Sequence, residues 1–143
     1  MPDIVHELRI EASPERVFDA IATREGLSAW WTRDTEAESR VGSVALFGFY
    51  NRADVFRMAV EALDRPRRVA WHCLGDDAEW KDTRLTFDLR PGPEGKGTGL
   101  RFVHANWRSA EGWMGTCSYT WAHVLARLKR HAETGERVPY FTE

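Results

Sequence analysis

The stretch EGWMGTCSYTWAHVLARLKRHAETG, residues 111–135, decides the fold of this chain. Its apolar residues recur at intervals of three and four, the spacing of one face of a helix. That face holds Met114, Cys117, Trp121, Leu125, Leu128 and Ala132, with Trp113 and Val124 at its edge. Gly135 follows as a candidate C-cap. The spacing predicts a single helix over about residues 111–134, roughly 36 Å long and able to cross a whole small sheet.

The residues before this helix alternate between apolar and polar in short runs, as half-buried strands do. The first run is Asp3–Glu11, and others follow between about residues 34 and 105. Turn-forming sequences separate them, among them Arg65–Arg67 and Pro91–Gly97. No helical spacing interrupts residues 55–90. The pattern therefore predicts consecutive antiparallel strands over residues 44–105 with one buried face.

Two short helices are expected after the first strand. Ser13 is the expected N-cap of the first, with Pro14 in its first turn. We expect Gly26 to break this helix and Leu27–Trp31 to form a second helical turn. The order of elements favours an α+β domain over residues 1–143, in which a curved antiparallel sheet wraps around the long C-terminal helix.

The composition excludes several classes of partner. Hydrophobic residues make up 43% of the 143 residues, charged residues 29%, and the net charge is -2, which gives no electrostatic reason to expect nucleic acid. The chain has no run of eighteen apolar residues, the length that would predict a membrane-spanning helix. Cys73 and Cys117 have no metal-binding or disulfide spacing, and the N-terminus lacks the pattern of a signal peptide. We expect a cytoplasmic protein.

Tryptophan is over-represented, with seven in 143 residues. Because so many indoles are hard to pack in one small core with every N–H satisfied, we expect some to line a cavity between the sheet and the helix. Eleven residues form the predicted ligand site: Phe56, Met58, Trp71, Cys73, Phe87, Phe102, His104, Trp113, Met114, Cys117 and Trp121. The ligand expected there is a hydrophobic small molecule or a lipid.

His104 is the one polar residue of this predicted site. It shares the apolar face of its strand, where we expect burial to keep the ring neutral and a ligand group or water to pair with it. Replacing it with Phe is then expected to weaken a polar ligand and leave the fold intact. His6, His104 and Cys117 are conceivable metal ligands, but a metal site needs three or four converging ligands, and we predict no metal, cofactor or catalytic residue.

Several segments resemble a known family. Ile10–Ala20 resembles the opening of the START-related (SRPBCC) helix-grip proteins, and Gly26–Trp31 resembles the second-helix segment of their branch similar to the activator of heat-shock-protein-90 ATPase. Thr83–Phe87, Gly99–His104 and the closing helix fit as well. The resemblance covers about residues 3–134 and implies a helix-grip fold with a hydrophobic cavity.

The resemblance leaves function open, because family members include lipid carriers, hormone receptors, aromatic polyketide cyclases and chaperone partners. We expect a binding module for a hydrophobic molecule. The alternatives are a cyclase or dehydratase acting on an aromatic or polyketide-like substrate, and a chaperone-associated interaction domain. Chaperone activation is less expected, since the co-chaperone carries a further N-terminal domain. The tail Val138–Phe141 is a candidate contact for a homodimer.

Overall fold

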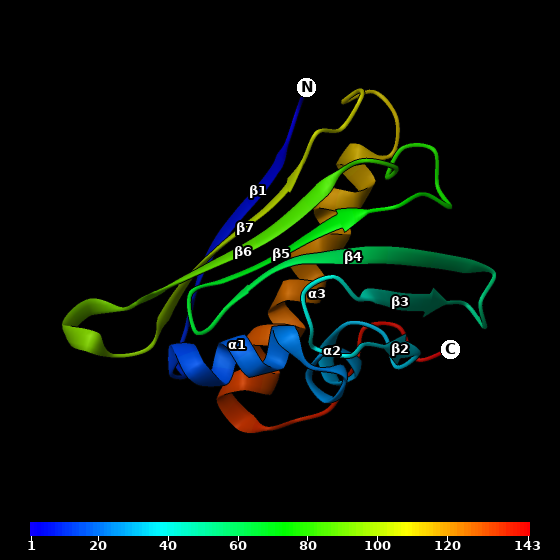
Figure 1. Ribbon diagram of the computed structural model, residues 1–143. Coiled ribbons are helices and arrows are strands. Elements are labelled where there is room, and N and C mark those ends of the chain that lie inside the picture. Colours follow the sequence, from blue (N-terminus) through cyan, green and yellow to red (C-terminus); the bar gives the residue numbers. More distant parts are fainter.

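The computed structural model describes residues 1–143. Its elements, in chain order, are β1 (Ile4–Ile10), α1 (Pro14–Ala22), α2 (Arg24–Trp30), β2 (Thr35–Glu36), β3 (Val44–Phe49), β4 (Asp54–Asp64), β5 (Arg68–Cys73), β6 (Arg84–Pro91), a 3-10 turn (Pro93–Gly95), β7 (Thr98–Ala105) and α3 (Met114–Thr134). The strands form one sheet in the order β1-β7-β6-β5-β4-β3-β2, and neighbouring strands are antiparallel. The sheet curves around α3, so the α+β helix-grip architecture predicted from the sequence is confirmed (Figure 1).

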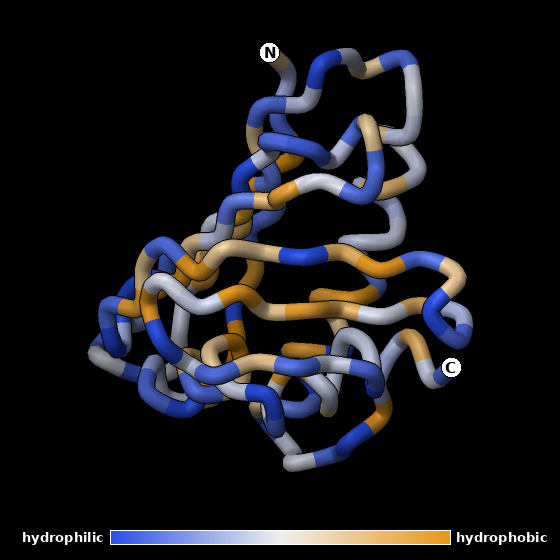
Figure 2. Tube along the Cα trace, turned by 45° about the vertical axis from the view of Figure 1, so that its right-hand side comes forward, coloured by the Kyte–Doolittle hydropathy of each residue, from blue (hydrophilic) through white to orange (hydrophobic).

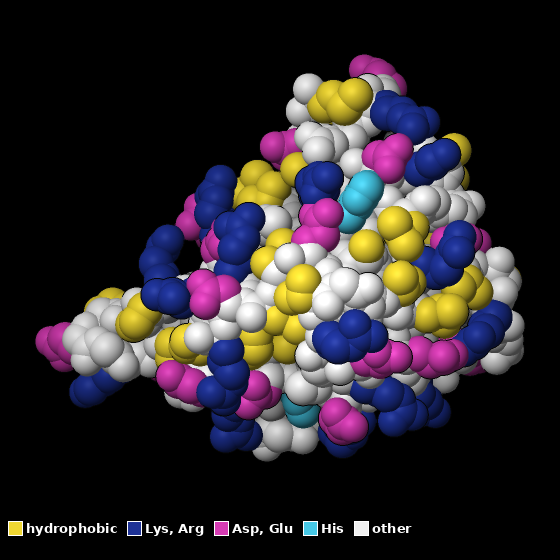
Figure 3. Space-filling model, in the orientation of Figure 1, with side chains coloured by type: hydrophobic (Ala, Val, Ile, Leu, Met, Phe, Trp, Pro, Cys, Tyr) yellow, Lys and Arg dark blue, Asp and Glu magenta, His cyan; other side chains and the backbone are white.

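Apolar and polar residues alternate along the strands, so the sheet has one apolar and one polar face. In β6, Leu85, Phe87 and Leu89 are buried beneath the helices. The hydropathy tube accordingly changes repeatedly between orange and blue along the strands (Figure 2). The outer face carries cross-strand ion pairs such as Arg68–Asp88, and Figure 3 shows hydrophobic side chains there only in small groups between charged ones. The apolar surface that can hold a ligand therefore lies on the helix side.

The long helix matches its prediction closely. It begins at Met114, three residues later than expected, because Trp113 is the N-cap and donates its backbone N–H to the carboxylate of Glu79 over 2.9 Å. It ends at Thr134, and Gly135, with a φ of 82°, is its left-handed C-cap. The side chains of Trp121, Leu125 and Leu128 are buried against the sheet. No helix of the structure combines the length and the apolar character that crossing a bilayer requires.

The two short helices differ from their prediction in one respect. Ser13 caps α1 as expected, its hydroxyl accepting the Arg16 backbone N–H. The expectation that Gly26 breaks the first helix is wrong. The break is at Thr23, which caps α2, and Gly26 lies inside α2. A Cβ on Gly26 would lie 2.3 Å from the backbone oxygen of Ala20, so glycine is needed there for the close approach of the two helices.

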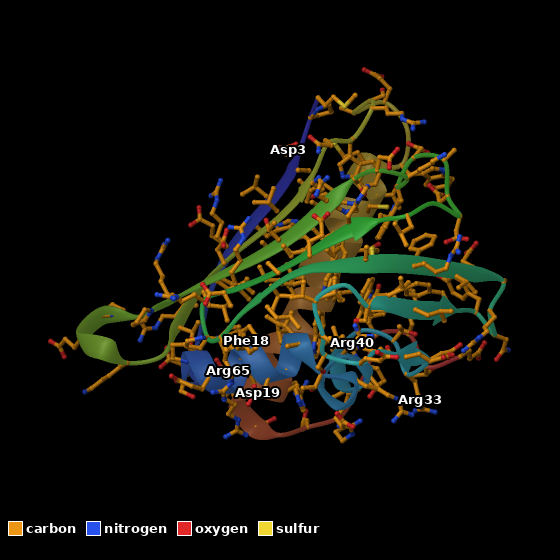
Figure 4. The ribbon with its side chains drawn as sticks, in the orientation of Figure 1. Asp3, Phe18, Asp19, Arg33, Arg40 and Arg65 are labelled. Atoms are coloured by element: carbon orange, nitrogen blue, oxygen red, sulfur yellow. The ribbon has the colours of Figure 1, made fainter.

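An ion pair links α1 to the turn between β4 and β5. Arg65, in the turn between β4 and β5, donates from Nε and Nη2 to the two carboxylate oxygens of Asp19, each over 3.0 Å. Figure 4 shows the two side chains side by side beneath the sheet. Because both are exposed, the pair orients the helix and contributes little to stability.

Six of the seven tryptophans are buried, with Trp113 alone exposed. The core accommodates them because they pack edge to face or stacked on other rings, as Trp30 does on Phe87 and Trp31 does on Trp71. Trp30 donates its indole N–H to the backbone oxygen of Ala20, and Trp107 has the one buried N–H without a partner. Burial alone therefore does not distinguish the tryptophans that line a cavity from those that only fill the core.

Candidate functional site

A cleft of about 470 Å³ opens at one end of the sheet–helix interface. It lies where the β3–β4 turn, the β5–β6 loop and the first half of α3 meet, toward the right-hand side of Figure 1. Thirteen residues line it, ten of them hydrophobic: Trp31, Phe49, Tyr50, Asp54, Phe56, Asp77, Trp80, Trp113, Cys117, Thr120, Trp121, Val124 and Phe141. Three other hollows of the surface are lined mainly by residues that are not hydrophobic. Of these four, the cleft is the one that suits an apolar ligand.

Trp121 forms the floor of the cleft. Its ring packs 4.5 Å from Phe102 in the core, 5.1 Å from Trp31 and 6.2 Å from Trp80, measured between centroids. Trp80 lies nearly parallel to it at an interplanar angle of 27° and contacts Phe56 at 4.5 Å. The walls are thus rigid aromatic faces whose positions are fixed by the packed core beneath them.

The C-terminal tail supplies another wall. The backbone of Phe141 pairs with the end of α2 in both directions: its N–H donates to Trp31 over 2.9 Å, and its oxygen accepts from Arg33 over 3.0 Å. Its ring packs on Phe49 with centroids 4.9 Å apart. The tail, expected as a homodimer contact, therefore folds onto its own chain, although Val138 and Tyr140 remain partly exposed.

The predicted site residues divide into two groups. Phe56, Trp113, Cys117 and Trp121 line the cleft. The others lie outside it: Met58, Trp71, Cys73, Phe87, Phe102 and His104 are buried in the solid core, and Met114 packs against that core. Side chains fill the centre of the sheet–helix gap. The ring centroids of Phe87 and Phe102 are 5.0 Å apart, and the ring of Phe102 packs on that of Trp121. The open space is at the end of the gap.

The residues that sequence reasoning missed lie mostly at the ends of elements. Phe49 ends β3 and Tyr50 follows it in the β3–β4 turn, Trp80 belongs to the loop after β5, and Phe141 belongs to the tail. Trp31, the C-cap of α2, was noted as helical and not as part of a site. The unusual number of tryptophans was the available signal, but it does not show which of them face open space.

His104 is fully buried and does not line the cleft. Trp121 donates its indole N–H to Nδ1 over 3.2 Å, so the proton of the neutral ring must be on Nε2. Nε2 then donates to the Thr83 hydroxyl over 2.9 Å, and that hydroxyl donates to the backbone oxygen of Trp80 over 2.6 Å. The expectation that a ligand or water completes the pairing of His104 is wrong, because the protein supplies both partners.

This hydrogen-bonded chain links two walls of the cleft, since it begins at the indole of Trp121 and ends at the backbone of Trp80. Burial lowers the pKa of His104 from 6.5 to about 3, so the ring is neutral near pH 7 as expected. A protonated ring would turn an N–H toward the N–H of Trp121. His104 is therefore a positioning residue for the cleft in its neutral form.

The two thiols are poorly suited to nucleophilic chemistry. Burial raises the pKa of Cys73 to about 11. Burial also raises the pKa of Cys117, which lines the cleft, and a hydrogen bond from Trp80 offsets this in part. No three side chains of the metal-binding types come together, and His6 instead contacts Ser118 on α3. The cleft offers shape and apolar surface, with Asp54, Asp77 and Thr120 as polar side chains.

Comparisons with known proteins agree with this architecture. The family model described as "Activator of Hsp90 ATPase homolog 1-like protein" matches residues 11–133. The Aha1 dimer of Colwellia psychrerythraea is 34% identical, with a TM-score of 0.83 over 94% of this chain and 98% of that one. A protein of Mesorhizobium loti is 20% identical, with a TM-score of 0.78 over 90% and 95% of the two chains.

A third solved structure is DynU16, a protein of the dynemicin biosynthetic locus. It is 19% identical, with a TM-score of 0.80, and the match covers 99% of this chain and 51% of DynU16. At this identity the likeness concerns the fold alone. No curated protein matches the chain.

Proposed function

The chain belongs to the family of activator of Hsp90 ATPase homolog 1-like proteins, and on that premise we propose that it binds a hydrophobic small molecule in the aromatic cleft. The single observation that carries the proposal is the lining of the cleft, ten hydrophobic residues of thirteen around a space of about 470 Å³. That volume lies within the usual range for small-molecule sites.

The shape of the cleft supports a flat ligand. Trp80 and Trp121 stack on each other with centroids 6.2 Å apart, so together they form one continuous aromatic wall, and Phe56 flanks Trp80. Aromatic faces held by a packed core do not have to be ordered on binding, so little conformational entropy is lost there. A flat aromatic or polycyclic molecule lying against this wall would pack on the rings face to face or edge to face.

The polar groups favour binding over catalysis. A cyclase or dehydratase would need an acid and a base deep in the pocket. Here the floor is Trp121, and the buried His104 behind it has both nitrogens paired within the protein. Asp54 is exposed, and Asp77 uses Oδ1 to accept the backbone N–H groups of Glu79 and Trp80. This arrangement therefore does not place an acid and a base together deep in the pocket, where they could transfer protons to a bound substrate.

An uncharged apolar dye tests the proposal. We expect N-phenyl-1-naphthylamine to bind with micromolar affinity, to gain fluorescence and to quench part of the tryptophan emission, because Trp31, Trp80, Trp113 and Trp121 line the cleft. The measurement is a fluorescence titration at pH 7, with a stoichiometry taken from calorimetry. A dye signal that stays flat up to the solubility limit would remove the basis for a binding function.

We also propose that the protein forms a homodimer. The relative from Colwellia psychrerythraea, at 34% identity, is described as a dimer. Here Tyr119 and Val138 are exposed on the outer side of α3 and the tail, where His123 packs on Tyr119 at 4.6 Å and reaches Tyr140 at 6.3 Å. Light scattering behind a sizing column should give the mass of two chains, and Tyr119→Lys should return it to one. A wild-type mass of one chain across the micromolar range would refute this.

A further inference from the structure

The charged groups of the cleft are all of one sign. Asp54, at the start of β4, and Asp77, in the β5–β6 loop, are its only charged lining residues, and no Lys, Arg or His lines it. Neither carboxylate takes part in any ion pair of the structure. The neighbouring Asp76, by contrast, is paired with Arg57. The cleft therefore presents two uncompensated negative charges beside apolar walls.

The carboxylate of Asp77 is held in place. Its Oδ1 accepts the backbone N–H of Glu79 over 2.9 Å and that of Trp80 over 3.1 Å, which leaves Oδ2 without a protein partner. Beside it, Glu79 is fixed by the N–H of Trp113. A fixed carboxylate at the edge of a low-dielectric cleft acts on a bound charge more strongly than a mobile one in water.

The negative field reaches the interior of the cleft. The pKa of Cys117, which lines it, is raised first by burial and then by the charges of Asp77 and Glu79. These charges oppose the appearance of a thiolate on α3, and they would oppose a ligand carboxylate or sulfonate in the same space. They would favour a cation there.

The aromatic lining adds to this preference. Trp31, Trp80, Trp113 and Trp121 line the cleft, and the negative face of an indole attracts ammonium groups within about 6 Å. Carboxylates at the mouth and indole faces inside are complementary to one kind of molecule. Its body is apolar and its end is positively charged.

We propose that the ligand of this cleft is a cationic aromatic amphiphile, an amine or quaternary ammonium compound with a flat apolar body. The inference rests on the proposed binding function and narrows it. The body packs between the aromatic walls, and the ammonium group lies near Asp54 and Asp77. Fatty acids and other anionic amphiphiles of equal size are rejected.

Three probes with one ring system test the charge preference. At pH 7, 1-naphthylmethylamine is a cation, 1-naphthylmethanol is neutral and 1-naphthoate is an anion. We expect calorimetry at low ionic strength to show the amine binding about tenfold more tightly than the carboxylate, with the alcohol between them. Added salt should lower the affinity for the amine and leave the affinity for the alcohol nearly unchanged.

Two variants assign the preference to the named carboxylates. The double variant Asp54→Asn/Asp77→Asn should bring the amine to the affinity of the alcohol, and an amide oxygen at position 77 can still accept backbone N–H groups. Asp64→Asn is the matched control, because Asp64 ends the same strand that Asp54 begins, about 33 Å away for an extended chain. It should keep the preference of the wild type.

The outcomes separate this inference from the proposed function. Equal affinities for the three probes, or a preference that the double variant retains, would overturn the charge selectivity and leave apolar binding in place. If neither the naphthalene probes nor the uncharged dye binds, the proposed function fails and the inference fails with it.

Discussion

Replacing His104 with Phe is expected to lower the free energy of unfolding at pH 7 by roughly 1–3 kcal/mol, the usual cost of leaving a buried polar group unpaired. The group in question is the indole N–H of Trp121, which donates to His104 Nδ1 over 3.2 Å. Urea denaturation of both proteins measures the difference. From the sequence we expected the substitution to weaken a ligand and to leave the fold intact. Because His104 belongs to the core and not to the cleft, we now expect its main effect to be on stability.

The same residue should make the wild-type protein sensitive to mild acid. The pKa of His104 is lowered by burial from 6.5 to about 3, so between these values the unfolded chain binds a proton that the folded chain does not. Stability is then complete above about pH 6.5 and falls as the pH decreases toward 3. From pH 7 to pH 5 this amounts to roughly 2 kcal/mol.

Two variants isolate this effect. His104→Phe should lose the part of the pH dependence that His104 causes, and His104→Gln should lose it too while offering a donor and an acceptor at the site. His123→Phe, the same change at an exposed position of α3, is the control and should keep the wild-type slope. A wild-type stability that is constant between pH 7 and pH 5 would contradict the buried neutral histidine.

Filling the cleft is expected to weaken binding strongly without unfolding the protein. Thr120 lines the cleft from α3 and donates to no protein acceptor, so Thr120→Trp would place an indole in the space of the ligand. Because the ligand would have to displace that ring or bind elsewhere, we expect the affinity for N-phenyl-1-naphthylamine to fall by about a hundredfold or more, roughly 2.7 kcal/mol. The titration used for the wild type measures it.

Thr134→Trp is the matched control, since it makes the same substitution at the exposed end of the same helix. It should bind the dye as the wild type does. Thermal unfolding of both variants separates loss of the site from loss of the fold. Undiminished binding by a well-folded Thr120→Trp would show that the dye does not occupy this cleft.

The periodic parts of the chain were predictable because their pattern is local. Alternation places Leu85, Phe87 and Leu89 on one face of β6 wherever that strand lies, and spacing by three and four does the same for α3. The role of Gly26 was predicted wrongly because a glycine can either end a helix or allow two helices to approach closely. The sequence shows the glycine but not which of these roles it has. Only the distance to Ala20 distinguishes them.

The cleft was predictable only in part, because it is built from the ends of elements. Phe56, Cys117 and Trp121 were found through their periodic faces, but the same faces also hold Met58 and Phe87, which lie deeper in the core. The positions of Trp80 and Phe141 depend on the path of a loop and a tail, which periodicity does not describe. The partners of His104 could not be assigned for the same reason, since Thr83 is contributed by that loop.

The indole N–H signals of the seven tryptophans give the most direct test of the cleft as a ligand site. In a 15N-resolved spectrum titrated with N-phenyl-1-naphthylamine, the signals of Trp31, Trp80, Trp113 and Trp121 should shift, because these four line the cleft. Those of Trp30, Trp71 and Trp107, which lie outside it, should stay nearly unchanged. Saturable binding that leaves the first four signals in place, or that shifts mainly the other three, would contradict the account.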